Sequence, residues 1–252
     1  MQLDSIYLLK TGFLFDIIKK SIKGYAYIIL VYQRKEDMNN FKDKAYQYIK
    51  EKILSCEYMP GQKLSESMLT EIIGTGRTPI REALLKLAQE DFVYIKPRAG
   101  TFVKPIAIES INELYQLRKI IEPTTAAMCK EQIDTRVLLD FCDRFQELSV
   151  SEEPSSIYLC NTLDFEFHKY IISCSNNTRL IDFFTSMIED AYRISIYNAL
   201  SMKSNSAENT YKEHYSITQA IIVGDSDLIR KRYLEHLSQS QLASIEAARL
   251  SI

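Results

Sequence analysis

No strand pattern is visible in the sequence after residue 106, and this feature constrains the fold more than any other. Apolar residues there recur about every three or four positions, which is the spacing of an amphipathic helix. Helices without a sheet can bury their apolar faces only against each other, so we expect an all-α antiparallel bundle over residues 107–252. The predicted helices are 109–131, 135–148, 156–174, 178–200, 208–223 and 226–249. The residues expected in their core include Leu114, Leu117, Ile121, Ile171, Ile172, Ile217 and Ile221.

Residues 42–106 follow a different pattern, which begins with two short helices. Ala45, Ile49 and Ile53 lie one turn apart and predict the first helix. Ser65 can cap the second helix, and Gly74 suits its left-handed C-terminal position. The apolar face of this second helix is expected to comprise Leu69, Ile72 and Ile73.

A third helix and a hairpin complete this N-terminal pattern. Thr78 is expected to cap the helix, with Pro79 at the first helical position, where a missing N–H does no harm. Two extended runs follow, Phe92–Lys96 and Thr101–Lys104, separated by Pro97-Arg98-Ala99-Gly100. This order of elements is that of a winged helix-turn-helix, whose third helix enters the major groove of DNA. The buried stripe of the third helix is expected to be Ala83, Leu84, Leu87 and Ala88.

Basic residues lie where such a module contacts DNA. Arg77 and Arg81 share one face of the third helix and can reach phosphates or a guanine edge. Arg98, at the hairpin tip, can reach the backbone or the minor groove; the alternative for each arginine is a solvated surface charge. Glu82 is expected to pair with a neighbouring Lys or Arg. Residues 42–106 hold 11 Lys and Arg against 8 Asp and Glu in a chain of net charge −2, which fits a DNA-binding module joined to an acidic domain.

The chain has only three histidines, His168, His214 and His236, and each lies in a predicted helix of the bundle. Asp164 precedes His168 by four residues, so both side chains point from one helix face. A lone helical histidine is more often packed or solvent-exposed than a ligand. One carboxylate and three imidazoles from three helices, however, form a credible ligand set for a divalent Zn, Ni or Mn ion.

Four protein ligands leave one or two positions open on an ion that accepts about five or six, and a small carboxylate can fill them. Arg118 is expected either to pair with such an anion or to form a salt bridge with Glu122, one turn on. A metalloenzyme that activates water is a second possibility, but the sequence has no HExxH motif, nucleophile motif or evident general base beside the ligands. A third possibility is a sensor of the metal ion itself.

Two motifs can be read in residues 60–103. They are Pro60-Gly61-x-x-Leu64-Ser65-Glu66 and Gly76-Arg77-Thr78-Pro79-Ile80-Arg81-Glu82-Ala83-Leu84-x-x-Leu87, followed by the wing Arg98-Ala99-Gly100-Thr101-Phe102-Val103. This pattern resembles the DNA-binding domain of the GntR superfamily of bacterial transcription regulators. The resemblance implies DNA contacts by Arg77, Thr78, Arg81, Arg98 and Gly100. Two departures are Gly76, where the family usually has Ser or Thr, and Asp91-Phe92-Val93, where Gly-Leu-Val is common.

The C-terminal half carries a second ordered pattern. It consists of Arg118-x-x-Ile121-Glu122, Asp164-x-x-Phe167-His168, Glu213-His214-x-x-Ile217, Gly224-Asp225 and Tyr233-Leu234-x-His236. This resembles the FCD ligand-binding domain of the FadR-type subfamily. In its metal-containing members an Asp and three His hold a divalent ion below a pocket, which implies that Asp164, His168, His214 and His236 are ligands here.

These features predict a dimeric transcription regulator and not an enzyme. A winged helix-turn-helix domain over residues 38–106 would bind double-stranded operator DNA. The bundle over residues 107–252 would form the homodimer and bind a small organic acid on its metal, with Arg118 in the effector site. Five scattered cysteines without a CxxC motif indicate free thiols, so we expect a cytoplasmic protein without membrane contact.

Residues 1–37 are atypical of the rest of the chain. They are rich in Ile, Tyr, Leu and Lys, and their longest apolar run, Tyr25–Tyr32, is too short to span a bilayer. One interpretation is a genuine N-terminal extension. The other is that Met38 is the true initiator, because Arg34-Lys35-Glu36-Asp37 can be encoded by a purine run that resembles a ribosome-binding site.

Overall fold

A computed structural model of the chain describes residues 41–151, 156–201 and 207–249. The atypical segment 1–37 and the alternative start at Met38 lie outside these residues. Backbone contacts divide the chain into two compact units, with the division after Pro105. None of the helices in the described residues has both the length and the apolar character that crossing a membrane requires.

From residue 41 onward, where the structure is described, the first unit contains three helices, α3 (Phe41–Leu54), α4 (Glu66–Ile73) and α5 (Arg77–Gln89). Ala45, Ile49 and Ile53 of α3 are fully buried, as predicted. The Ser65 hydroxyl accepts a hydrogen bond from the Met68 N–H, and Gly74 closes α4 in the left-handed conformation with φ 69°. The sequence signals for the start and the end of α4 are therefore confirmed.

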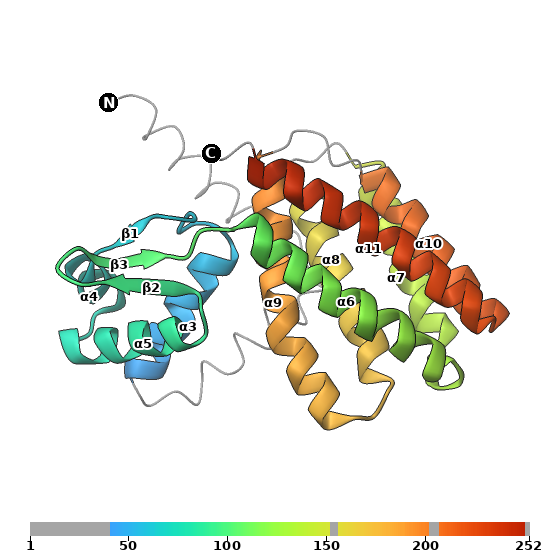
Figure 1. Cartoon of the computed structure of the whole chain (residues 1–252), viewed down its shortest axis with the longest axis horizontal. Coiled ribbons are helices and arrows are strands. Elements are labelled where there is room, and N and C mark those ends of the chain that lie inside the picture. Colours follow the sequence, from blue (N-terminus) through green and yellow to red (C-terminus); the bar gives the residue numbers. More distant parts are fainter. Residues whose placement is uncertain (1–40, 152–155, 202–206, 250–252) are drawn as a thin grey trace. The chain divides into compact units, whose positions relative to one another are not determined.

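A small antiparallel sheet completes the first unit (Figure 1). Strands β2 (Val93–Lys96) and β3 (Gly100–Val103) form the predicted hairpin, with Val93 opposite Val103. The sequence did not predict β1 (Lys63–Leu64), which pairs with the other edge of β3. A strand of two residues is too short for apolar alternation to be visible, so only pairing with β3 identifies it.

Two local predictions for this unit were wrong. Helix α5 begins at Arg77 and its N-cap is Gly76, which makes no side-chain cap, so Thr78 lies inside the first turn. Pro79 then occupies the third helical position, where its missing N–H is still harmless because the first four N–H groups have no helical acceptor. Ile72, expected in the core, is exposed, because the buried row of α4 consists of Leu69 and Ile73.

The second unit is a bundle of helices, and no strand occurs among its described residues. Helix α11 packs along α6, α10 packs along α7, and α8 lies beside α9 (Figure 1). This arrangement confirms the predicted fold class of a winged helix-turn-helix followed by an all-α bundle. The helices are α6 (Ile108–Met128), α7 (Thr135–Ser149), α8 (Ser156–Ser173), α9 (Thr178–Ser201), α10 (Ala207–Val223) and α11 (Ser226–Arg249).

Helix α6 departs from the prediction at two points. It ends at Met128, and a separate 3₁₀ turn, η1 (Lys130–Gln132), takes up the residues that the sequence assigned to its last turn. Leu117 was expected in the core but is 41% exposed, whereas Leu114, one turn earlier, is buried. The core side of α6 is shifted around the helix because the buried pair Arg118 and Glu122 shares that side with Leu114 and Tyr115.

Candidate metal centre and nucleic-acid interface

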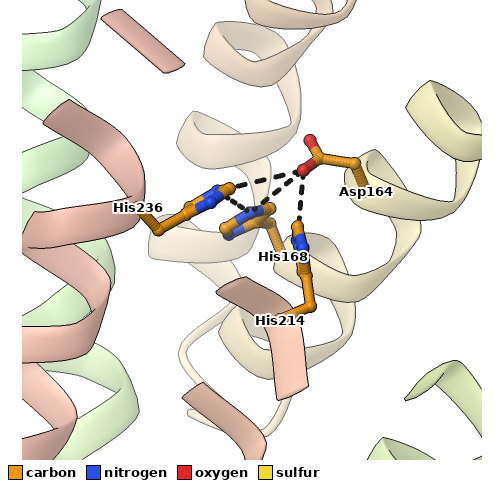
Figure 2. A group of neighbouring side chains, drawn as sticks. All are labelled: Asp164, His168, His214 and His236. Carbon is orange, nitrogen blue, oxygen red and sulfur yellow. Dashed lines mark hydrogen bonds and ion pairs between the residues drawn. The ribbon is translucent and has the colours of Figure 1, made fainter. Parts of the chain in front are cut away.

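The structure brings together the four residues that the sequence selected as metal ligands (Figure 2). Helix α8 contributes Asp164 and His168, α10 contributes His214 and α11 contributes His236. One ligand atom of each residue lies within 4.8 Å of the corresponding atoms of the other three. The three histidines are buried and Asp164 is partly exposed, and Asp164 and His236 line a cavity between the helices.

The distances within this group suit a transition-metal ion. Nε2 of His214 is 3.1 Å from Oδ1 of Asp164, and Nε2 of His168 is 3.1 Å from Nε2 of His236. The same Asp164 oxygen is 3.8 Å from Nε2 of His168 and 3.9 Å from Nε2 of His236. Two ligand atoms each about 2.1 Å from a cation and at right angles to one another are separated by about 3 Å. The observed spacing therefore matches donors that share one ion.

The outer nitrogen of every histidine lies close to an oxygen atom, with hydrogen-bond geometry for His214 and His236 and an ion-pair contact without that geometry for His168. Nδ1 of His168 is 2.6 Å from Oε2 of Glu122, Nδ1 of His236 is 2.7 Å from Oε2 of Glu213, and Nδ1 of His214 is 2.8 Å from the Thr210 carbonyl oxygen. An acceptor at Nδ1 fixes the ring with its proton on that side, so the inner Nε2 of a neutral ring presents a lone pair. This is how proteins orient histidines toward a metal.

The inner nitrogens fit a cation between them. If His168 and His236 are both neutral with their protons on Nδ1, their Nε2 lone pairs face each other at 3.1 Å and repel unless a positive charge lies between them. Nε2 of His214 is buried and has no hydrogen bond among the described residues, although Oδ1 of Asp164 lies 3.1 Å away. A bound ion would satisfy this nitrogen and the lone pairs of the other two rings.

A buried ion pair supports the metal centre from one side. Nε of Arg118 donates to Oε1 of Glu122 at 2.6 Å, and the other carboxylate oxygen of Glu122 faces His168. Burial raises the pKa of Glu122, but the Arg118 guanidinium and the His168 ring outweigh that effect and hold the pKa at about 2. Glu122 is therefore a carboxylate at neutral pH and lies between the Arg118 charge and the candidate ligand His168.

The metal-free group holds a proton where the ion would lie. Burial lowers the pKa of His168, but the carboxylates of Glu122 and Asp164 outweigh it and raise that pKa to about 9. Burial and the neighbouring rings of His214 and His168 hold the pKa of His236 well below its usual range. His168 thus carries the positive charge at neutral pH, and His236 is neutral.

A cavity of about 180 Å³ adjoins the four ligands. Asp164 and His236 line it, together with residues from α6, α8, α9, α10 and α11. A small organic anion fits such a space. Polar side chains that line the cavity include Tyr115, Arg118, Asn198, Gln239, Ser240 and Ser244.

The structure places Arg118 so that both of its predicted roles are available. It forms the predicted salt bridge with Glu122, and it also lines the cavity. Its Nη2 group is buried and has no hydrogen-bond partner among the described residues. An unsatisfied guanidinium donor in a buried wall is a strong recognition point for an anion.

The predicted DNA-contacting residues of α5 lie on the surface of the first unit. Arg77 and Thr78 are exposed in the first turn. Arg81 is 61% exposed, and its Nε donates to Oε2 of Glu66 at 2.9 Å. Glu82 lies 3.7 Å from Lys42, so its predicted pairing with a nearby basic residue is confirmed. The end of α5 that a major groove would meet therefore carries two accessible arginines.

The wing holds Arg98 in an unusual backbone conformation. Arg98 has φ 61°, in the left-handed region that favours glycine, within the turn closed by the Ala99 N–H and the Lys96 carbonyl. Gly100 has φ 117°, and a Cβ there would lie 3.0 Å from Cε of Lys63. Gly100 is thus needed for the shape of the wing, whereas Arg98 occupies a strained position with an exposed side chain.

Sequence reasoning missed the groups that orient the ligands. It identified Glu122 only as a partner of Arg118, and its contact with His168 comes from packing of α6 against α8. It gave Thr210 no role and quoted Glu213 only as a motif position. The sole hint was their proximity to His214, because an acceptor for an outer nitrogen can come from any neighbouring helix.

Comparison with known families accounts for most of the chain. Residues 41–103 match the bacterial regulatory proteins of the gntR family, and residues 113–239 match the FCD domain. The first match covers the three helices and the hairpin of the first unit. The second covers all four candidate ligands and most of the cavity lining, and it ends before Ser240, Ala243 and Ser244.

Individual relatives agree with this assignment. The Nta operon transcriptional regulator of Aminobacter aminovorans is 27% identical over 192 residues, which span 74% of this chain and 86% of that protein. The transcriptional regulator LutR of Bacillus subtilis is 26% identical over 205 residues, spanning 74% and 93%. A solved GntR regulator from Rhodococcus sp. RHA1 has the same fold, with a TM-score of 0.67 at 19% identity over 81% of this chain and 97% of that one.

Proposed function

Because the chain belongs to the gntR family of bacterial regulatory proteins and carries an FCD domain, we propose that a small carboxylate bound at a divalent metal controls its operator binding. The chain is a DNA-binding transcription regulator, and its relatives are regulators and not enzymes. The observation that carries the proposal is the convergence of four possible ligand atoms, two of them from residues that line the same cavity as Arg118.

Asp164, His168, His214 and His236 would hold the ion. Their nitrogen and oxygen donors suit Zn, Ni or Mn. When bound, the ion supplies a Lewis acid that attracts a carboxylate. Nη2 of Arg118 would supply a second, charge-assisted contact on the same cavity wall, and the cavity has room for a small acid.

We propose that the DNA-binding domain spans residues 38–106 and contacts a two-fold symmetric operator. Arg77, Thr78 and Arg81 would meet the major groove, and Arg98 and Gly100 would place the wing along the backbone or the minor groove. Two features support this assignment. The arginines are exposed, and the turn of the wing holds Arg98 in the left-handed region at the tip of the hairpin.

The domain over residues 107–252 would form the homodimer. Leu117, Ile120 and Met128 of α6 are 41%, 60% and 75% exposed. At about 100° per residue these three side chains lie within an arc of about 80° on α6. An apolar row on the helix that follows directly from the first unit suits contact with a second copy, which would set the spacing of the two DNA heads.

Metal content and effector response test the proposal together. Protein purified without chelators should contain about one equivalent of a divalent metal, and His214→Ala should lose it. A carboxylate that shifts the melting temperature of the wild-type protein should also change its operator affinity, and should do neither in the variant.

A His214→Ala protein with full metal content would overturn the ligand assignment. Operator release by chelation alone, with no response to any carboxylate, would identify the ion as the effector. It would thereby contradict the role proposed for the cavity.

A further inference from the structure

The cavity wall beside Arg118 has an unusual hydrogen-bonding character. Tyr115, Asn198 and Ser244 all line the cavity, and each is at least nine-tenths buried. The three residues come from three helices, α6, α9 and α11, and are linked to one another by hydrogen bonds. Their protons can therefore be assigned one by one.

Ser244 determines the orientation of its two neighbours. Its hydroxyl has a single proton, which it donates to the Ser240 carbonyl at 2.7 Å. Ser244 can then only accept from other groups. Nδ2 of Asn198, at 3.0 Å, donates to its oxygen, and so does the Tyr115 hydroxyl, at 3.3 Å.

This assignment leaves acceptors without donors. Because Nδ2 of Asn198 faces Ser244, Oδ1 is on the other side of the amide, and this oxygen is buried without a hydrogen bond among the described residues. The Tyr115 hydroxyl donates its hydrogen bond to Ser244, so its oxygen can only accept a further hydrogen bond. The wall thus presents two oxygen acceptors, Oδ1 of Asn198 and the Tyr115 hydroxyl oxygen, beside the one N–H of Nδ2 that the bond to Ser244 does not use.

Arg118, beside these acceptors, is a hydrogen-bond donor. The guanidinium of Arg118 lies 5.2 Å from the centre of the Tyr115 ring, and its buried Nη2 is a donor without an acceptor in the described part of the chain. Arg118 therefore requires an acceptor, best an anionic one, and Oδ1 of Asn198 requires a hydrogen-bond donor. A buried polar group left unpaired costs about 1–3 kcal/mol, so a ligand that satisfies both sides is favoured over one that satisfies only the first.

From this wall we propose that the effector is a small hydroxycarboxylate, whose hydroxyl donates its proton to Oδ1 of Asn198 while its carboxylate meets Arg118. This inference rests on the proposed function and specifies the class of ligand. A plain acid leaves Oδ1 of Asn198 unpaired, and an oxo acid brings one oxygen acceptor against another. An amino acid can donate, but it brings a positive charge beside the fixed charge of Arg118 and the proposed metal.

Matched ligands test the inference on the zinc-loaded wild-type protein. Propionate, butyrate and succinate are each compared with their hydroxy, oxo and amino counterparts by calorimetric titration. In at least one set the hydroxy acid should bind about tenfold or more tightly than the plain, oxo and amino acids of the same skeleton. Equal binding of plain and hydroxy acids, or tighter binding of oxo or amino acids, would overturn the inference and leave the proposed function intact. Binding of none would overturn both.

Two variants test the role of Asn198. Asn198→Ala removes the acceptor, so the ratio of hydroxy-acid to plain-acid affinity should fall toward one. Ser244→Ala removes the group that fixes the amide, so Asn198 can turn Nδ2 toward the cavity and the preference for hydroxy over oxo acids should shrink or reverse. Zinc content confirms that each variant keeps its site.

Ser186→Ala is the matched control. This serine also donates to a carbonyl of its own helix, but it is exposed on α9 and does not line the cavity. Its affinity ratios should equal those of the wild type. Unchanged ratios in both Asn198→Ala and Ser244→Ala would contradict the inference, even if the wild-type protein prefers hydroxy acids.

Discussion

The two units of this protein use charged side chains in opposite ways. In the first unit the Arg81 side chain is 61% exposed and pairs with Glu66 at the surface. In the second unit the side chains of Arg118 and Glu122 are 4% and 1% exposed and form part of a continuous buried network with His168. A surface pair can exchange its partner at little energetic expense, whereas a buried charge depends on every neighbour it has.

This difference matches the two kinds of recognition. Arg81 can leave Glu66 for a phosphate or a base because water solvates both groups during the exchange. Arg118 is held by Glu122 through Nε, and its Nη2 has no hydrogen-bond partner among the described residues. Under the proposed function, the first unit would present exchangeable contacts to a long polyanion, and the second a rigid, partly satisfied site to a small one.

Breaking one ion pair in each unit should give the largest contrast. Glu122→Gln removes the charge that compensates Arg118 and contacts His168, so the chelated protein should lose about 3–5 kcal/mol of unfolding free energy. Glu66→Gln breaks the exposed pair with Arg81 and should cost less than about 1 kcal/mol. Urea unfolding of the two variants measures both effects, and equal losses would contradict the comparison.

The second prediction concerns the pH dependence of metal binding by the second unit. In the metal-free protein the pKa of His168 is raised to about 9, so the ring keeps a proton below that pH which metal must displace. Apparent zinc affinity should therefore fall about tenfold for each pH unit below about 9 and level off above it. Competition with a chelator at several pH values measures this slope.

Glu122→Gln provides the control for this slope. It removes the carboxylate that contributes most to the raised pKa of His168, so the affinity should level off at a lower pH than in the wild type. A zinc affinity that does not change between about pH 6 and 8 would show that no proton is displaced.

A single arginine of the first unit should matter for DNA but not for the effector. Arg81→Ala should weaken operator binding by about 1–3 kcal/mol, because it removes a contact at the groove end of α5. Arg136→Ala removes an exposed arginine of α7 that pairs with Asp134, and it should leave operator affinity unchanged. Fluorescence anisotropy at moderate salt measures both, and full binding by Arg81→Ala would refute the assignment of α5.

The smallest expected effect is at Gly76, the N-cap of α5. Its φ of −78° is open to any residue, and an added Cβ would meet only Cδ of Pro79 at 4.0 Å. Gly76→Ser supplies the missing capping hydroxyl and should stabilise the first unit by a few tenths of a kcal/mol. Thermal unfolding detects the gain. Gly100→Ser is the opposite case and should destabilise the wing, because that position has φ 117° and a close contact with Lys63.

Local signals were predictable wherever one segment decided the outcome. Ser65, Gly74 and the row from Ala45 to Ile53 behave as their sequence context predicts, because caps and helix faces depend on neighbours within about four residues. The prediction for Thr78 was wrong because α5 begins two residues earlier than expected, with Gly76 as its N-cap. The prediction that Leu117 is buried was wrong because the polar pair Arg118 and Glu122 lies on the buried side of α6.

The sequence by itself determined the order of elements, the helix faces and the identity of four residues that could share an ion, because a single pair four residues apart and a chain with only three histidines leave few other sets. Tertiary structure decided which oxygen faces each outer ring nitrogen, which donor of Arg118 stays unpaired and which side of the Asn198 amide is free. These outcomes depend on the packing of α6, α8, α9, α10 and α11, where side chains far apart in the chain compete for a few protons and lone pairs. Periodicity in one segment contains no information about that competition.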